Sequence, residues 1–125
     1  MLRRRLVGAC RVGAAAVASA FAALAFVACE SPTLPLPPPA LPTVGTGPDA
    51  DHVRLVATCG GAEPGALMVV VNENLNVPGD KAVSGSIADG CGAWDALAYA
   101  HKGDVLDVTQ ELGTNASTPV RVLIQ

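Results

Sequence analysis

The stretch AWDALAYAHKGDVLDVTQEL, residues 93–112, contains two runs of strand length that are separated by the turn dipeptide Gly103-Asp104. In the second run Leu106 and Val108 alternate with polar residues, which places one face of a strand in a core and the other face in water. The first run is also alternating, although two sets of its residues compete for the inward face. Both runs predict β-strands.

Similar runs lie on both sides of this stretch. HVRLVAT, residues 52–58, alternates, and ALMVVVN, residues 66–72, is nearly continuously apolar, as is typical of a strand that is covered on both faces. KAVSGSIAD, residues 81–89, and PVRVLIQ, residues 119–125, complete the set, with turn residues between the runs. Six or seven short strands at this spacing predict an all-β fold, a small sandwich of antiparallel sheets over residues 49–125.

Residues 1–28 have the layout of a secretory signal peptide. A basic stretch from Met1 to Arg11 precedes an uncharged, alanine-rich run from Val12 to Ala28. This run of about 17 residues is slightly shorter than a typical membrane-spanning helix. We expect a signal-peptide helix that is removed, and an uncleaved membrane anchor is the alternative.

The apolar run ends at Phe26-Val27-Ala28-Cys29, which resembles the lipobox of bacterial lipoproteins, with Phe26 in place of the usual leucine. The resemblance implies cleavage before Cys29 and lipidation of Cys29, and two or three acyl chains suffice for stable anchoring. It implies an exported protein that is lipid-anchored in the bacterial envelope. Glu30 instead of aspartate after the cysteine favours the outer membrane, at its periplasmic face or at the cell surface.

Residues 29–48 form a proline-rich segment, with seven prolines between Ser31 and Pro48. Because proline fixes φ and has no N–H group, we expect neither helix nor sheet here. The composition predicts a disordered linker, rich in extended polyproline II, that spaces a domain from the membrane. A proline-rich ligand for another domain is the alternative.

Cys59 and Cys91 are the two cysteines that remain after Cys10 leaves with the signal peptide and Cys29 carries lipid. Export to an oxidising compartment predicts a disulfide between them. The bond would close a loop of about 33 residues and contribute about 3.5 to 4 kcal/mol in the chain-entropy model. Such a covalent link would help, because a domain this small buries only about 60% of the surface of its unfolded chain and is marginally stable.

The turns of the second half resemble those of bacterial immunoglobulin-like domains of cell-surface proteins. The matching positions are Asp89, Gly90 and Trp94, then Gly103 and Asp104, then Gly113, Asn115, Ser117 and Pro119. The resemblance implies an immunoglobulin-like sandwich with a structural or binding role, and a carboxypeptidase-regulatory-like sandwich is the alternative fold. Two departures from the pattern are the residues between Gly90 and Trp94, and Thr114. We expect Trp94, the only tryptophan, to fill the core beside the disulfide rather than form a ligand platform.

The sequence contains no arrangement of residues that is typical of an enzyme. Ser84 and Ser86 lie in a strand pattern, and His101 near Asp104 is better explained as a surface histidine beside a turn. The carboxylates lack the dense alternating spacing of a calcium loop, so we expect neither a metal nor another cofactor. From Cys29 onward four basic residues stand against eleven acidic ones, a net charge of −7, which excludes a basic patch for nucleic acid.

NENLNVPGD, residues 72–80, is the longest polar loop and the candidate binding loop. Its candidate contact residues are Asn72, Glu73, Asn74, Asn76 and Asp80. We expect a lipid-anchored module that contacts a protein or glycan partner through this loop. The alternative is an inhibitor or accessory subunit of an envelope enzyme.

Overall fold

The computed structural model describes residues 34–125, so the predictions for the signal peptide and for Cys29 lie outside the described residues. This part contains eight strands: β1 (Thr43–Thr46), β2 (His52–Ala57), β3 (Leu67–Asn72), β4 (Val83–Ile87), β5 (Trp94–Tyr99), β6 (Val105–Leu112), β7 (Asn115–Ala116) and β8 (Val120–Leu123). In residues 34–125 there is no helix long and apolar enough to cross a membrane. The predicted all-β class is confirmed. The six runs singled out in the sequence are all strands, and β1 and β7 are additional.

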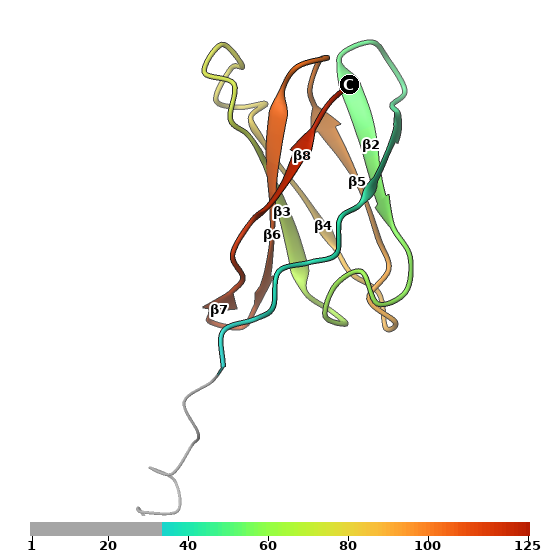
Figure 1. The fold of residues 1–125 in the computed structure, drawn as a ribbon, viewed down its shortest axis with the longest axis vertical. Coiled ribbons are helices and arrows are strands. Elements are labelled where there is room, and N and C mark those ends of the chain that lie inside the picture. The colour runs from blue at the N-terminus through green and yellow to red at the C-terminus, as the bar shows by residue number, and fades with distance from the viewer. Residues whose placement is uncertain (1–33) are drawn as a thin grey trace, which may run out of the picture. The chain divides into compact units, whose positions relative to one another are not determined.

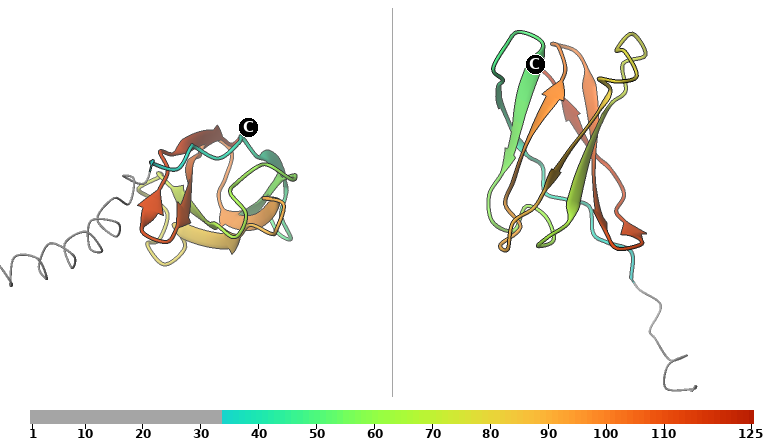
Figure 2. Two further views of the ribbon diagram at one scale, coloured as in Figure 1. Left: turned by 90° about the horizontal axis from the view of Figure 1, so that it is seen from below. Right: turned by 180° about the vertical axis from the view of Figure 1, so that it is seen from behind.

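The strands form two antiparallel sheets that face each other as a sandwich (Figures 1 and 2). One sheet has the order β1-β2-β5. The other has the order β4-β3-β6, and both β7 and β8 pair with β6 on its far side. The chain passes between the sheets after β2, after β4 and after β5, so strands that are distant in sequence become neighbours.

The core lies between the two sheets and is built from alternate residues of each strand. Its largest fully buried apolar side chains are Leu55 on β2, Met68 and Val70 on β3, and Leu106 and Val108 on β6. The inward face of β5, which the sequence leaves open, consists of Trp94, Ala96 and Ala98. Trp94 is 3% exposed, which confirms its predicted place in the core.

The prediction that the apolar run of β3 is covered on both faces is wrong. Met68 and Val70 are buried, but Leu67 is 41% and Val71 36% exposed on the opposite face. Within residues 34–125 no second layer packs over that face of the sheet. An unbroken apolar run therefore marks a strand here without marking burial of both faces.

The prediction of neither helix nor sheet in the proline-rich segment is wrong for its last part. Thr43–Thr46 forms β1, which pairs antiparallel with β2, and the Gly47 N–H donates to the His52 oxygen at 3.1 Å to close the hairpin. Pro39 and Pro42 are buried against the domain, and residues 35–125 form one compact unit. The physical reason is local: the stretch from Thr43 to Gly47 contains no proline, so its N–H groups are free to join a ladder.

The predicted disulfide is confirmed: Cys59 and Cys91 are bonded. Cys59 follows the end of β2 and Cys91 precedes the start of β5, so the bond joins two neighbouring strands of one sheet. The surrounding turns are tightly packed, since the Gly60 N–H donates to the Cys91 oxygen at 2.7 Å. Gly92 has a φ of 82°, and a Cβ there would lie 2.1 Å from the Ala62 oxygen, so this turn requires glycine.

Candidate functional site

The candidate site is the loop between β3 and β4, residues 73–82, which we call the β3–β4 loop. It projects beyond the end of the sandwich, at the end opposite to β7 (Figure 1). The candidate residues Glu73, Asn76 and Asp80 are exposed, Asn74 is half-buried, and Asn72 lies inside at the end of β3. The structure thus gathers the predicted residues at one place but gives them different roles.

Asn72 holds the base of the loop from inside the domain. Its side chain is 6% exposed, and its Nδ2 donates to the Tyr99 oxygen at 2.8 Å and to Asp104 Oδ2 at 2.9 Å. Its Oδ1 accepts the N–H of Asn74 at 2.9 Å. Asn72 therefore supports the loop and offers little surface to a partner.

Asp104, in the turn before β6, is the anchor of the β3–β4 loop. The residue is 6% exposed, its Oδ1 accepts from Asn74 Nδ2 at 2.7 Å, and its Oδ2 accepts from the His101 N–H at 3.0 Å. Burial raises the pKa of Asp104, but the hydrogen bonds from Asn72, His101 and Asn74 outweigh burial, and the net pKa is lowered. The carboxylate is thus ionised at neutral pH and holds both asparagines in place.

Hydrogen bonds within the β3–β4 loop fix its path above this anchor. Asn74 Oδ1 accepts the Asn76 N–H at 3.0 Å, and the Asn74 backbone oxygen accepts the Val77 N–H at 3.0 Å. Leu75, between these two turns, is 98% exposed. Leu75 is not among the polar contact residues predicted from the sequence, although an apolar residue among asparagines is visible in NENLN.

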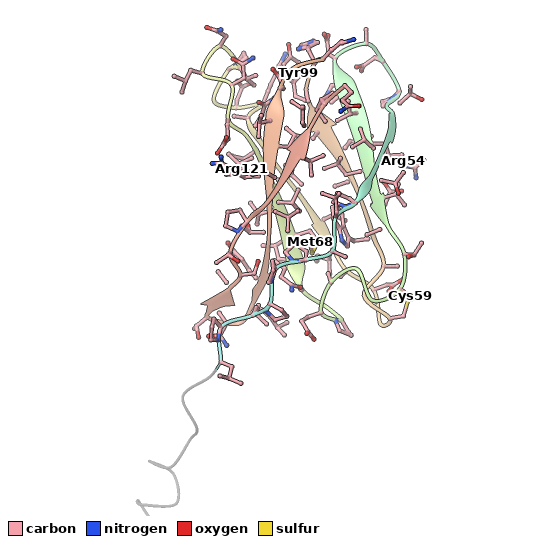
Figure 3. All side chains as sticks on the ribbon, in the orientation of Figure 1. Arg54, Cys59, Met68, Tyr99 and Arg121 are labelled. Atoms are coloured by element: carbon pink, nitrogen blue, oxygen red, sulfur yellow. A yellow bond between two sulfur atoms is a disulfide. The ribbon has the colours of Figure 1, made fainter. Side chains whose placement is uncertain are left out.

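A group of basic and aromatic side chains lies next to the loop around Tyr99 (Figure 3). Lys81 Nζ lies 5.1 Å from the centre of the Tyr99 ring, and the rings of His52 and His101 contact the same ring edge-on at 5.7 and 5.1 Å. These contacts join the far end of the loop to β5.

Each of the two histidines is paired with an aspartate. His52 Nδ1 lies 2.7 Å from Asp49 Oδ1, and His101 Nε2 lies 2.8 Å from Asp51 Oδ1. The hydrogen bond from His52 lowers the pKa of Asp49. Within residues 34–125 no serine hydroxyl bonds to either imidazole, and no group of three His, Cys, Asp or Glu residues could hold a metal ion. Each arrangement is a histidine–aspartate hydrogen bond at the surface of the domain.

Glu73, the first residue of the β3–β4 loop, contacts a side chain of β8. Its Oε1 accepts from Arg121 Nη2 on β8 at 3.3 Å, and Arg121 Nε lies 3.4 Å from Asp107 Oδ1 on β6. A hydrogen bond with Asp107 and partial desolvation raise the pKa of Glu73, against the attraction of Arg121. A shallow depression of about 310 Å³ between Glu73, Asn74, Gly103, Asp104 and Val105 separates the loop from the start of β6.

No protein-family model matches the chain, and neither a curated protein nor a solved structure shows significant similarity to it. The class of protein is therefore defined by residues 34–125 themselves. They form a small, disulfide-bonded antiparallel β-sandwich that holds one long loop in a fixed conformation at its end.

Proposed function

We propose that the protein is a non-catalytic binding module, lipid-anchored at Cys29 in the bacterial envelope, and that the β3–β4 loop is its contact surface. The observation that carries the proposal is Leu75, which is 98% exposed at the tip of a loop that is hydrogen-bonded to the buried Asp104. Exposing the apolar side chain of a leucine to water has an unfavourable free energy that is roughly proportional to the exposed area. A loop that is already fixed loses little conformational entropy when it binds, so an apolar tip on such a loop is suited to a protein contact.

The strand pairing supports an immunoglobulin-like domain. The pairs β2–β5, β3–β6 and β6–β8 correspond to the B–E, C–F and F–G pairs of the immunoglobulin sandwich, and β4 lies beside β3. The disulfide and the tryptophan differ from those of antibody domains, since Cys59–Cys91 joins neighbours of one sheet and Trp94 lies on β5. Loops at the ends of such sandwiches are the usual binding surfaces.

The position of the chain entry supports a loop that points away from the membrane. The first residues of the compact unit, from Pro35, enter beside β7, where Leu36 bridges Ser117, and the β3–β4 loop lies at the other end (Figure 1). Cys29 precedes Pro35 by six residues, which span roughly 20 Å at most when fully extended. A domain anchored at Cys29 would be tethered close to the membrane through the end that is opposite to the β3–β4 loop.

The anchor is tested by the intact mass of the protein extracted from membranes of the cells that produce it. We expect the mass of residues 29–125 plus acyl chains, and we expect no acylated species from a Cys29→Ser variant. A mass of the unlipidated full-length chain would overturn this part of the proposal and favour an uncleaved anchor.

The contact surface is tested with a photo-reactive residue at position 75 and, as a matched control, at Thr114, which is exposed in the turn between β6 and β7. We expect a discrete cross-linked adduct from position 75 in intact cells and none from position 114. Equal adducts at both positions, or none at position 75, would contradict the proposal.

The identity of the adduct separates the two functions left open by the sequence. If the partner is an envelope enzyme whose activity changes when the purified chain is added, the protein is an inhibitor or accessory subunit. An apolar residue at the tip of a fixed loop is also what insertion into an enzyme cleft requires. A partner without activity favours the structural or adhesive module.

A further inference from the structure

The strand β4 is an edge of its sheet. It pairs with β3 on one side, and β5, its neighbour in the chain, belongs to the other sheet and forms no ladder with it. In residues 34–125 no strand pairs with the outer edge of β4. An open edge presents unpaired N–H and C=O groups that a further strand can use.

The hydrogen bonds to β3 show which residues of β4 face that edge. The Asn72 N–H donates to the Ala82 oxygen at 2.8 Å and the Ala88 N–H donates to the Ala66 oxygen at 2.9 Å. Because antiparallel pairs alternate, the even-numbered residues between 82 and 88 bond to β3. The N–H and C=O groups of Val83, Gly85 and Ile87 therefore point away from β3, toward the open edge.

The sequence around β4 is complementary to itself when it is reversed. In KAVSGSIAD, residues 81–89, Gly85 is the centre, and the positions at equal distance on either side carry matching residues. The pairs are Ser84 with Ser86, Val83 with Ile87, Ala82 with Ala88, and Lys81 with Asp89. The first three pairs match in size and polarity, and the last pair has opposite charges.

We propose that two copies of the chain associate by antiparallel pairing of β4 with β4 about a twofold axis at Gly85. In this register Val83 of each copy lies opposite Ile87 of the other, and Gly85 lies opposite Gly85. These are the residues whose backbone groups face the edge, so each of the three pairs exchanges two N–H···O bonds. Lys81 and Asp89 lie just outside the two ends of β4, and once the ammonium group of Lys81 turns from the Tyr99 ring its attraction to Asp89 of the other copy favours this register over its neighbours.

The exposed apolar side chains on the outer face of the sheet support the same β4–β4 pairing. Val83 is 57% and Ile87 70% exposed, next to the partly exposed Leu67 and Val71 of β3. Pairing places the two apolar stripes side by side across the axis. Asp89 keeps one carboxylate oxygen for Lys81, since its Oδ1 accepts the N–H groups of Cys91 and Ala93 at 2.9 and 3.0 Å.

The edge formed by β1 differs from the β4 edge, because it has features that protect an edge strand from further pairing. It is bounded by Pro42 and Pro48, and when its sequence TVGT is reversed about its centre Val44 lies opposite Gly45, which does not match it in size. Val83–Ile87 contains no proline and no charge. A five-residue edge contact is small, so we expect a dissociation constant on the order of micromolar.

The first test is disulfide trapping of the whole chain in the cells that produce it. A Gly85→Cys variant places two cysteines on the axis, at the spacing of about 5.5 Å between Cα atoms that a hydrogen-bonded antiparallel pair has, which a disulfide can bridge. Gly85 has room for a Cβ, whose nearest contact would be the Met68 oxygen at 3.4 Å. Thr109→Cys, two strands inward on the same face, is the control. We expect a covalent homodimer on oxidation only with Gly85→Cys.

The second test is sedimentation of the purified whole chain over a range of concentrations. Gly85→Lys places two like charges on the axis and should weaken dimerisation by roughly tenfold or more, whereas Thr109→Lys, with the same change of charge, should leave it unchanged. The emission of Trp94 checks that both variants are folded. A Gly85→Cys variant that cross-links no better than Thr109→Cys overturns the proposal. A dimer that Gly85→Lys does not weaken, or an adduct between position 85 and a different protein, also overturns it.

Discussion

Gln110 Nε2 on β6 donates a hydrogen bond of 2.6 Å to the backbone oxygen of Pro37 and so ties the proline-rich segment to the sandwich. The same side chain accepts the Glu63 N–H at its Oε1 at 2.7 Å, and it is only 1% exposed. One buried amide thus satisfies two backbone groups from two different loops. Residues that would otherwise act as a free linker become part of the domain.

Replacement of Gln110 by leucine should destabilise the protein by about 1 to 3 kcal/mol, because the Pro37 oxygen and the Glu63 N–H would each lose the hydrogen bond to this side chain. The free energy of unfolding in denaturant, followed by the fluorescence of Trp94, measures the effect. Thr109→Val, on the outward face of β6, should change stability by less than about 0.5 kcal/mol. A Gln110→Leu variant as stable as Thr109→Val would show that the amide is dispensable.

The role of the proline-rich segment illustrates what the sequence does not reveal about this fold. Alternating or apolar runs predict β2, β3, β4, β5, β6 and β8, since side-chain burial on one face leaves a local pattern. The docking of Pro37 depends on Gln110, which is 73 residues away, and no local pattern reports such a contact. Thr43–Thr46 is equally hidden, because it is an exposed edge strand in a proline-rich context.

The position of the candidate loop was predictable from the sequence, but the contacts that hold the loop in place were not. Its length and polarity are visible in the sequence, and so are asparagines that favour turns. Asp104 lies 32 residues after Asn72, and only the pairing of β3 with β6 brings the two side chains to 2.9 Å. The division of the loop into buried anchors and an exposed Leu75 therefore follows from the sheet topology.

Asp104→Asn should destabilise the protein by about 2 to 4 kcal/mol at neutral pH, because the carboxylate accepts from both Asn72 and Asn74, whereas an amide can accept from only one of them and presents its NH2 group to the other. Since folding lowers the pKa of Asp104 below its ordinary value of 3.8, the ionised group stabilises the folded state fully above that pH. The contribution is lost as the pH falls through the lower, folded-state pKa.

The stability difference between the wild type and Asp104→Asn should accordingly be constant near neutral pH and shrink below about pH 4. Unfolding curves between neutral pH and pH 2.5 measure it. Asp80→Asn, in the exposed part of the same loop, should follow the wild type throughout. A difference that does not depend on pH would mean that folding leaves the pKa of Asp104 unchanged, which would contradict this prediction.

Loss of the disulfide should cost about 3.5 to 4 kcal/mol, since the bond joins residues 32 positions apart and restricts the unfolded chain. A Cys59→Ser, Cys91→Ser double variant and the reduced wild type should show the same lowered free energy of unfolding. Reductant should leave the double variant unchanged, which is the control. A wild type whose stability does not respond to reductant would contradict a stabilising role of the bond.

Trp94 should report the core directly, because it is the only tryptophan and is 3% exposed. We expect the fluorescence emission maximum of the folded protein to lie at a shorter wavelength than that of the unfolded chain. We also expect iodide to quench the fluorescence of Trp94 only weakly. Its Nε1–H is buried without a hydrogen-bond partner, so Trp94→Phe removes an unfavourable group together with some packing. Trp94→Ala should cost about 3 to 5 kcal/mol and Trp94→Phe less than half as much. Equal losses in the two variants would contradict this prediction, because the phenyl ring would then recover none of the packing of the indole.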